Sequence, residues 1–182
     1  ERLLERQQGD AALLDVDLVP VDDLVVGEHG AGEFRVLALE RLDRLLDDEF
    51  VNFLFVGRIA PNKKIEDHIR LAEHYKRYVD AYYRFIFVGK TDAVPAYYRT
   101  IRALLLEYQM PSDRFLFTGP VPDSDLAAYY RHADVYVSLS EHEGFCVPLL
   151  EAMAADVPVL AYSAAAVPET LGGAGVQFAP KD

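Results

Sequence analysis

Residues 134–151 decide the fold, because a buried strand, a glycine turn and the start of a helix follow one another there. The strand is predicted by the apolar run Asp134-Val135-Tyr136-Val137-Ser138. Glu143 and Gly144 fall on the turn, and Glu151 falls a turn or two into the helix. This order of elements presents unpaired backbone N–H groups to an anion. Carboxylates on either side can accept hydrogen bonds from hydroxyls, so the pattern predicts a phosphorylated, hydroxyl-rich ligand.

The same alternation of strand and helix extends over most of the chain. Apolar runs predict strands over residues 51–56, 84–88, 114–117, 134–138, 158–161 and 176–178. Helical spacing between them predicts helices over residues 63–78, 96–108, 123–131, 148–155 and 167–171, the third capped by Asp123-Ser124-Asp125. Near-continuous apolar strands between helices indicate a parallel sheet covered on both faces. We therefore predict an α/β fold with a Rossmann-like, doubly wound parallel sheet, whose ligands bind beyond the carboxyl ends of the strands.

Length and composition bound the possibilities. A chain of 182 residues holds one full domain and an appendage, which we place over residues 51–182 and residues 1–50. The formal net charge of −12 argues against a broad nucleic-acid surface, although it allows a local basic pocket. The opening residues resemble the interior of a helix, as if the chain were cut from a longer protein.

Cysteine usage and hydropathy suggest a cytoplasmic protein. No apolar run is long enough to predict a transmembrane segment, and no signal peptide is recognised at the start. The single Cys146 excludes an internal disulfide and a cysteine-based zinc site. His142 stands between two glutamates, but no second histidine is spaced to join it, so we expect no metal site.

The end of the first strand carries a basic motif. Gly57 closes the strand, Arg58 follows it, and Lys63 is expected to open the next helix. A lysine at a helix N-terminus is electrostatically disfavoured unless an anion lies nearby. The guanidinium and the ammonium are together suited to neutralise a diphosphate. The alternative is that both are solvated surface cations.

The glycine turn offers backbone groups rather than side chains. Phe145, Cys146 and Val147 follow Gly144 without polar side chains suited to a ligand, which leaves their amides as the useful groups. Cys146 is expected to be a packed side chain rather than a nucleophile, because no paired histidine is evident. The alternative is a structural capping turn followed by a surface glutamate, Glu151.

These motifs together resemble the C-terminal half of the family-4 retaining glycosyltransferases. The resemblance rests on Gly57-Arg58 with Lys63, the strand ends Gly89 and Gly119, and Glu143 and Glu151 followed by Pro158-Val159. It covers about residues 51–178 and implies the GT-B architecture, in which two Rossmann-like domains face a cleft. Residues 51–182 would then bind the nucleotide-sugar, and residues 1–50 would be a remnant of the N-terminal domain with the interdomain connection.

The resemblance also implies roles for individual residues. Arg58 and Lys63 would bind the donor diphosphate and stabilise the leaving nucleotide, while Glu143 would contact the donor sugar, so these three are the catalytic candidates. Glu151 would bond the ribose hydroxyls. The whole donor-binding set is Gly57, Arg58, Lys63, Glu143, Gly144, Phe145, Cys146, Val147 and Glu151. The implied reaction transfers a sugar from a nucleotide-sugar to an acceptor with retention, and needs neither a cofactor nor a metal.

Departures from the family pattern leave several questions open. Asp156 stands where the family has a glycine, and we expect it to adopt the left-handed conformation that aspartate tolerates. Because the N-terminal partner domain is nearly all absent, we expect weak nucleotide binding and little turnover. The base (UDP, GDP or ADP), the sugar and the acceptor stay open, as does a homo-oligomer formed through residues 1–50. Alternative functions are a non-enzymatic nucleotide-binding or scaffold domain and a GT-B nucleotide-sugar epimerase.

Overall fold

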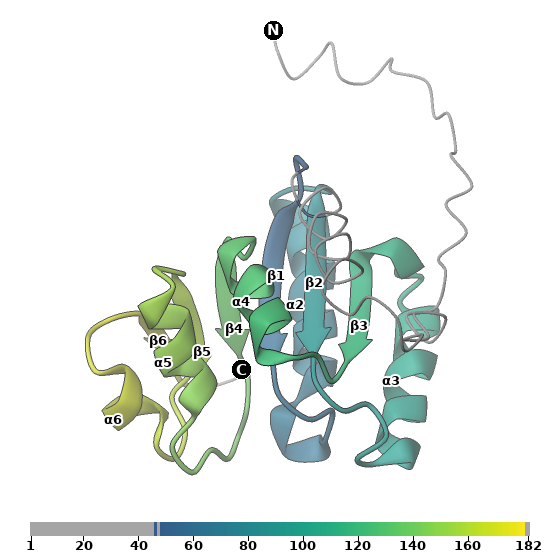
Figure 1. Ribbon diagram of the computed structural model, residues 1–182. Coiled ribbons are helices and arrows are strands. Elements are labelled where there is room, and N and C mark those ends of the chain that lie inside the picture. The colour runs from purple at the N-terminus through teal and green to yellow at the C-terminus, as the bar shows by residue number, and fades with distance from the viewer. Residues whose placement is uncertain (1–45, 47, 181–182) are drawn as a thin grey trace, which may run out of the picture. The chain divides into compact units, whose positions relative to one another are not determined.

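A six-stranded parallel sheet forms the centre of the structure, which is a computed structural model describing residue 46 and residues 48–180. Its strands are β1 Val51–Val56, β2 Tyr83–Val88, β3 Phe115–Gly119, β4 Val135–Ser138, β5 Val159–Tyr162 and β6 Val176–Phe178. All neighbours pair in parallel, in the order β3-β2-β1-β4-β5-β6 (Figure 1). The chain therefore winds outward from β1 and then outward again from β4 on the other side. The predicted doubly wound sheet is confirmed, and its direction reverses between β1 and β4, where such sheets bind ligands.

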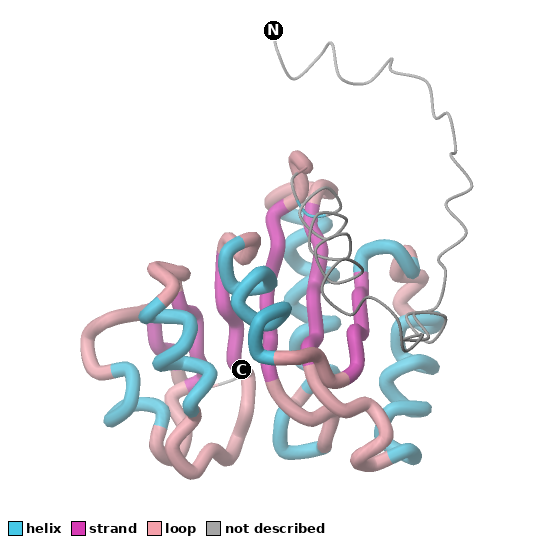
Figure 2. Tube along the Cα trace, in the orientation of Figure 1, coloured by secondary structure: helices cyan, strands magenta, loops and turns pink. Residues whose placement is uncertain are grey.

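Helices cover both faces of the sheet (Figure 2). One face packs against α2 Ile65–Tyr78 and α3 Pro95–Glu107, and the other against α4 Asp123–Arg131, α5 Val147–Ala154 and α6 Val167–Leu171. Two short 3₁₀ helices, η3 Pro61–Lys63 and η4 Ser112–Arg114, lie in the connections. Alternate residues of each strand point to opposite faces, so the sheet separates two hydrophobic clusters.

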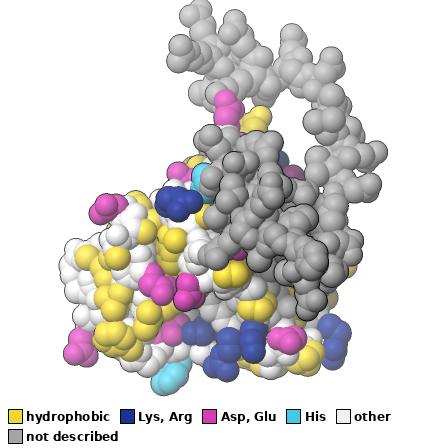
Figure 3. All heavy atoms as spheres, in the orientation of Figure 1, with side chains coloured by type: hydrophobic (Ala, Val, Ile, Leu, Met, Phe, Trp, Pro, Cys, Tyr) yellow, Lys and Arg dark blue, Asp and Glu magenta, His cyan; other side chains and the backbone are white. Residues whose placement is uncertain are grey.

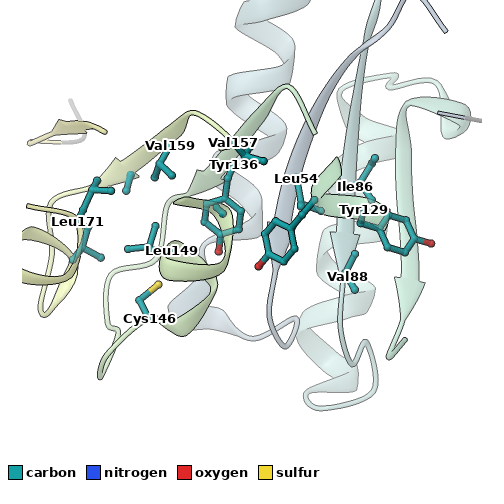
Figure 4. Close-up of a cluster of buried hydrophobic side chains, with 14 of the residues drawn as sticks. Leu54, Ile86, Val88, Tyr129, Tyr136, Cys146, Leu149, Val157, Val159 and Leu171 are labelled. Atoms are coloured by element: carbon teal, nitrogen blue, oxygen red, sulfur yellow. The ribbon is translucent and has the colours of Figure 1, made fainter. Parts of the chain in front are cut away.

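Stacked aromatic rings fill the cluster beneath α2 and α3. Phe53 and Phe85 are paired in register on β1 and β2, and their rings stack with centroids 4.7 Å apart. Phe115 on β3 continues the stack at 5.7 Å from Phe85. Each such pair contributes about 0.5–1.5 kcal/mol beyond its area burial. The opposite cluster is aliphatic and tyrosine-rich, and Figure 4 shows Tyr136 of the sheet near Leu149 of α5, with Leu54 on the side of Ile86.

Two local predictions about helix starts are wrong. Lys63 does not open α2: it ends η3, and Lys64 turns the chain with a left-handed φ of 52° before α2 begins at Ile65. The run Asp123-Ser124-Asp125 does not cap α4, because its N-cap is Pro122 and makes no side-chain capping bond. Asp123 and Asp125 lie in the first turn instead, where their charge still favours the helix dipole.

A partly buried polar network lies at the end of the sheet where the strands begin, around the buried Asn52 and Arg84. Arg84 donates to the Asn52 side chain at 3.0 Å and to Asp48 at 2.5 Å, while the Asn52 backbone N–H donates to Asp134 at 2.8 Å.

Most of the predicted leader over residues 1–50, and any oligomer contact through it, lies outside the described residues. Within the described part of the chain, no helix is long and apolar enough to span a bilayer.

Candidate functional site

The loops that follow β1 and β4 meet at the reversal point of the sheet. The Lys63 ammonium lies 2.6 Å from Glu143 Oε1, and the two side chains are only 15% and 10% exposed. Two further hydrogen bonds join the same loops: the Asn62 side-chain amide donates to the His142 carbonyl at 3.2 Å, and the Glu141 N–H donates to the Asn62 carbonyl at 2.9 Å. Two motifs separated by 80 residues in the sequence therefore form one site.

The ion pair changes the argument about Lys63. The sequence pattern suggested that a ligand anion compensates a lysine at a helix start. The structure instead supplies Glu143 as its counter-ion and places Lys63 before α2 rather than at its first turn. A diphosphate that approaches Lys63 must therefore share the ammonium with Glu143.

The remaining cations around the site differ in their pairing. Lys64 lies 3.2 Å from Glu141 and 3.7 Å from Glu66, and the hydrogen bond to Glu141 raises its pKa. Arg58 is exposed and has no ion-pair partner among residues 46 and 48–180. Figure 3 shows basic side chains gathered along the lower rim of the molecule, where the strands in Figure 1 end. Of the two cations predicted from the sequence, Lys63 is thus paired with Glu143, whereas Arg58 has no counter-ion within the described part of the chain.

Glycines allow the strand ends to approach closely. The Gly57 N–H donates to the Val88 carbonyl at 2.8 Å, and the Gly89 N–H donates to the Gly119 carbonyl at 2.9 Å. A Cβ added at Gly89 would lie 2.2 Å from the Gly57 carbonyl oxygen. Only a residue without a side chain fits there, so the backbone leading to Arg58 is held directly against the end of β2.

The start of α5 presents backbone donors as predicted from the sequence. Cys146 is the N-cap, with a left-handed φ of 57°, and Val147 is the first helical residue. In the described part of the chain, no protein acceptor receives the N–H of Phe145 or Cys146. The turn is fixed from the other side, because the Thr170 hydroxyl donates to the Phe145 carbonyl at 2.8 Å. The N–H groups are thus both unpaired and held in place.

Cys146 is a packed side chain and not an activated thiol. Its side chain lies in the cluster with Leu149 and Tyr136 and is 6% exposed (Figure 4). Burial, with a smaller contribution from the Glu143 charge, raises the pKa of the thiol to about 11. The thiol therefore stays protonated near neutral pH, which is unsuited to a nucleophile.

Glu151 lies in the second turn of α5 and has a partner that the sequence reasoning missed. The Tyr130 hydroxyl on α4 donates to Glu151 Oε2 at 2.8 Å. Both residues line an open surface hollow of about 650 Å³ between α4 and α5, which Asp123 and Leu126 also border. No pattern within the α4 sequence says which element this tyrosine faces, so only the tertiary structure reveals the pair.

The predicted site residues are thus placed to different degrees. Lys63 and Glu143 are in contact, whereas no hydrogen bond or ion pair joins Arg58 to either of them or to the turn before α5. Gly144 is exposed, and a Cβ there would meet nothing within 4 Å, so the fold alone does not require glycine. The common binding role of these residues stays a prediction.

Comparisons with known proteins identify the family and support the fold. A family model described as glycosyl transferases group 1 matches residues 40–181. The serotype-specific mannosyltransferase WbdA of Escherichia coli is 31% identical over 157 residues, which is 82% of this chain and 19% of that protein. A GDP-mannose-dependent alpha-mannosyltransferase of Mycolicibacterium smegmatis is 38% identical over 107 residues, covering 59% of this chain and 24% of that protein. The chain therefore spans only about a fifth to a quarter of these curated relatives.

One solved structure shows the same fold with ligands bound. Anabaena HepE, in complex with UDP and glucose, superposes with a TM-score of 0.64 at 20% identity, covering 78% of this chain and 38% of that one. At this identity the likeness concerns the fold.

Proposed function

This chain belongs to the glycosyl transferases group 1 family, and we propose that it is the donor-binding domain of a GT-B enzyme that transfers a sugar from a nucleotide-sugar to an acceptor. The observation that carries the proposal is the Lys63–Glu143 contact at the reversal point of the sheet. It brings a cation and a hydroxyl acceptor together beside the unpaired amides at the start of α5. A diphosphate joined to a sugar needs these three kinds of group.

In this proposal the donor diphosphate binds at the N-terminus of α5. The Phe145 and Cys146 N–H groups donate to its distal phosphate, and the dipole of α5 favours its charge. Arg58, which has no carboxylate to neutralise it among the described residues, supplies a second contact. The Lys63 ammonium bridges the diphosphate and Glu143.

The same groups favour the transfer step. The bond between the anomeric carbon and the diphosphate oxygen breaks as a bond to the acceptor oxygen forms, and the electron pair stays on the diphosphate. Negative charge therefore grows next to Arg58 and Lys63, whose positive charges stabilise it. The acceptor hydroxyl loses its proton, which passes to the departing diphosphate oxygen as the step is completed. Glu143 accepts hydrogen bonds from sugar hydroxyls and so orients the anomeric carbon.

For the donor we propose GDP-mannose first. The two relatives described above are mannosyltransferases, and one of them is named for its dependence on GDP-mannose. Titration of the chain with GDP, UDP and ADP by calorimetry tests the base, and GDP is expected to bind most tightly. Tighter binding of UDP would move the proposal to a UDP-sugar.

Two variants test the site itself. Arg58→Ala is expected to weaken GDP binding by tenfold or more, because a hydrogen bond to a charged group contributes about 1.5–3 kcal/mol. Glu151→Ala is expected to weaken GDP binding because it removes the carboxylate proposed to accept hydrogen bonds from the ribose hydroxyls. Arg102→Ala removes the same charge from exposed α3 and should leave binding unchanged. If the wild-type chain shows no saturable binding, or if Arg58→Ala and Glu151→Ala bind GDP as tightly as the wild type, a scaffold domain is supported instead.

Retention of configuration and independence of metal and cofactor are implied by the family resemblance and stay predictions. The cytoplasmic location suggested by cysteine usage and hydropathy also stays a prediction. In the full-length parent, NMR of the product should show the donor's anomeric configuration, and EDTA should leave turnover unchanged. Recovery of epimerised donor in place of glycosylated acceptor would favour the epimerase alternative.

A further inference from the structure

The α4–α5 contact contains a tyrosine whose hydroxyl binds the carboxylate proposed to hold the donor ribose. We propose that Tyr130 is a positioning residue that orients Glu151, so that the carboxylate is already aimed at the vicinal ribose hydroxyls before the nucleotide binds. The inference rests on the proposed function and adds a specific role for a residue outside the predicted set. The starting observation is the 2.8 Å hydrogen bond from Tyr130 to Glu151 Oε2.

The geometry gives this hydrogen bond a fixed donor. Tyr130 is 4% exposed, and its ring packs near that of Tyr136 with centroids 6.3 Å apart. Its hydroxyl lies 3.4 Å from the Pro148 carbonyl, well beyond its distance to Glu151. The carboxylate is therefore the main acceptor of the single hydroxyl proton.

The protonation state supports a permanent donor. Burial, followed by the hydrogen bond to Glu151, raises the pKa of Tyr130 above its ordinary value. The hydroxyl therefore keeps its proton throughout the neutral range.

The carboxylate keeps capacity for a ligand. An ionised carboxylate has two oxygens and about four lone-pair sites, and Tyr130 uses one of them. Glu151 is only partly buried and borders the open hollow between α4 and α5, so its carboxylate can be reached from outside. A glutamate held in one rotamer loses less freedom on binding than a free one, which is the usual gain from preorganisation.

The competing explanation is that Tyr130 only ties α4 to α5. A purely structural role predicts that loss of the hydroxyl lowers stability and weakens every ligand of the site alike. A positioning role predicts a loss confined to ligands that carry ribose hydroxyls. Ligands with and without these hydroxyls therefore separate the two.

The experiment compares Tyr130→Phe with the wild-type chain by calorimetry, using GDP, 2′,3′-dideoxy-GDP and inorganic pyrophosphate. The variant is expected to bind GDP about fivefold more weakly, the loss of one hydrogen bond, and the other two probes with unchanged affinity. In the double variant with Glu151→Ala, the tyrosine substitution should have no further effect on GDP. Tyr83→Phe is the matched control, because it removes another buried hydroxyl, one that lies 3.6 Å from Met110 Sδ.

The outcomes separate the two proposals. If the wild type binds GDP and Tyr130→Phe binds it equally well, or weakens all three probes by the same factor, the positioning role is overturned and the donor site stands. If the wild type binds no nucleoside diphosphate, the proposed function falls and the role of Tyr130 falls with it. Thermal unfolding of each variant, compared with Tyr83→Phe, shows whether a uniform loss comes from a damaged fold.

Discussion

Replacing Gly89 by alanine tests the close approach of the strand ends that support the site. Gly89 has a φ of +141°, and a Cβ there would lie 2.2 Å from the Gly57 carbonyl oxygen and 2.7 Å from its carbonyl carbon. The oxygen is about 1 Å too close for any real contact, and both atoms belong to backbone that no side-chain rotation can move. The turn that carries Arg58 must therefore shift to accept the methyl group.

The expected cost has two parts. Overpacking a tight site costs about 1–3 kcal/mol, and a sparsely populated backbone conformation costs about 1–3 kcal/mol for a residue with a side chain. Gly89→Ala should therefore lower the free energy of unfolding by about 2–6 kcal/mol, the sum of the two parts and a large share of the roughly 5–15 kcal/mol typical of a domain. Urea denaturation followed by far-ultraviolet circular dichroism measures it as a shift in midpoint at constant slope.

Two glycines provide matched controls. Gly119 also has a positive φ, +70°, but a Cβ there meets nothing within 4 Å, so Gly119→Ala should cost only about 1 kcal/mol. Gly144 has neither constraint, and Gly144→Ala should change stability by less than about 0.5 kcal/mol. If Gly89→Ala unfolds at the same urea concentration as Gly144→Ala, the close approach of β1 and β2 is refuted.

Three further predictions follow from individual site residues. Glu143→Gln should tighten GDP binding, because it removes a negative charge that repels the diphosphate, and Lys63→Met should weaken GDP binding, because it removes a positive charge that attracts it. Calorimetry measures both affinities, and a change in the same direction for both variants would contradict the proposed bridge. The Cys146 thiol should stay protonated up to about pH 11 in the folded chain, so its stabilising effect is complete below about pH 9 and is lost as the pH rises through 11. The urea midpoint should therefore fall more between pH 8 and pH 10.5 for the wild type than for Cys146→Ala. An equal fall in both proteins would show that the thiol is not buried. Asp156→Gly should raise the melting temperature by relieving a left-handed φ of 57°, a gain of about 0.5–1 kcal/mol, whereas a lower melting temperature would mean that the aspartate side chain stabilises the turn.

The positions of the elements could be predicted because each is specified by its own residues. Apolar runs marked the strands, the first three of them with a glycine at the end, and the left-handed conformation predicted for Asp156 is confirmed at φ 57°. The start of α2 could not be predicted, because Lys64 takes a left-handed conformation that lysine does not favour locally. The turn before α2 is held by contacts from the loop after β4, which is far away in the sequence. One of them is the hydrogen bond that the Glu141 N–H donates to the Asn62 carbonyl.

That the motifs of Lys63 and Glu143 lie near each other could be predicted from the sequence, but the ion pair between them could not, and the binding role of the predicted residues stays a prediction. Both Lys63 and Glu143 were assigned to one site from separate motifs, yet their mutual neutralisation depends on side chains separated by 80 residues. The hydroxyl that binds Glu151 belongs to Tyr130, which reads locally as an ordinary core residue of α4. Such pairs depend on the packing of two elements, which no single stretch of sequence encodes.

Chemical-shift mapping of the backbone amides during a GDP titration tests the central claim most directly. The account predicts that the amides of Gly57, Arg58, Phe145 and Cys146 move together and saturate with one dissociation constant. Shifts confined to the opposite end of the strands, around Asn52 and Arg84, would contradict the account.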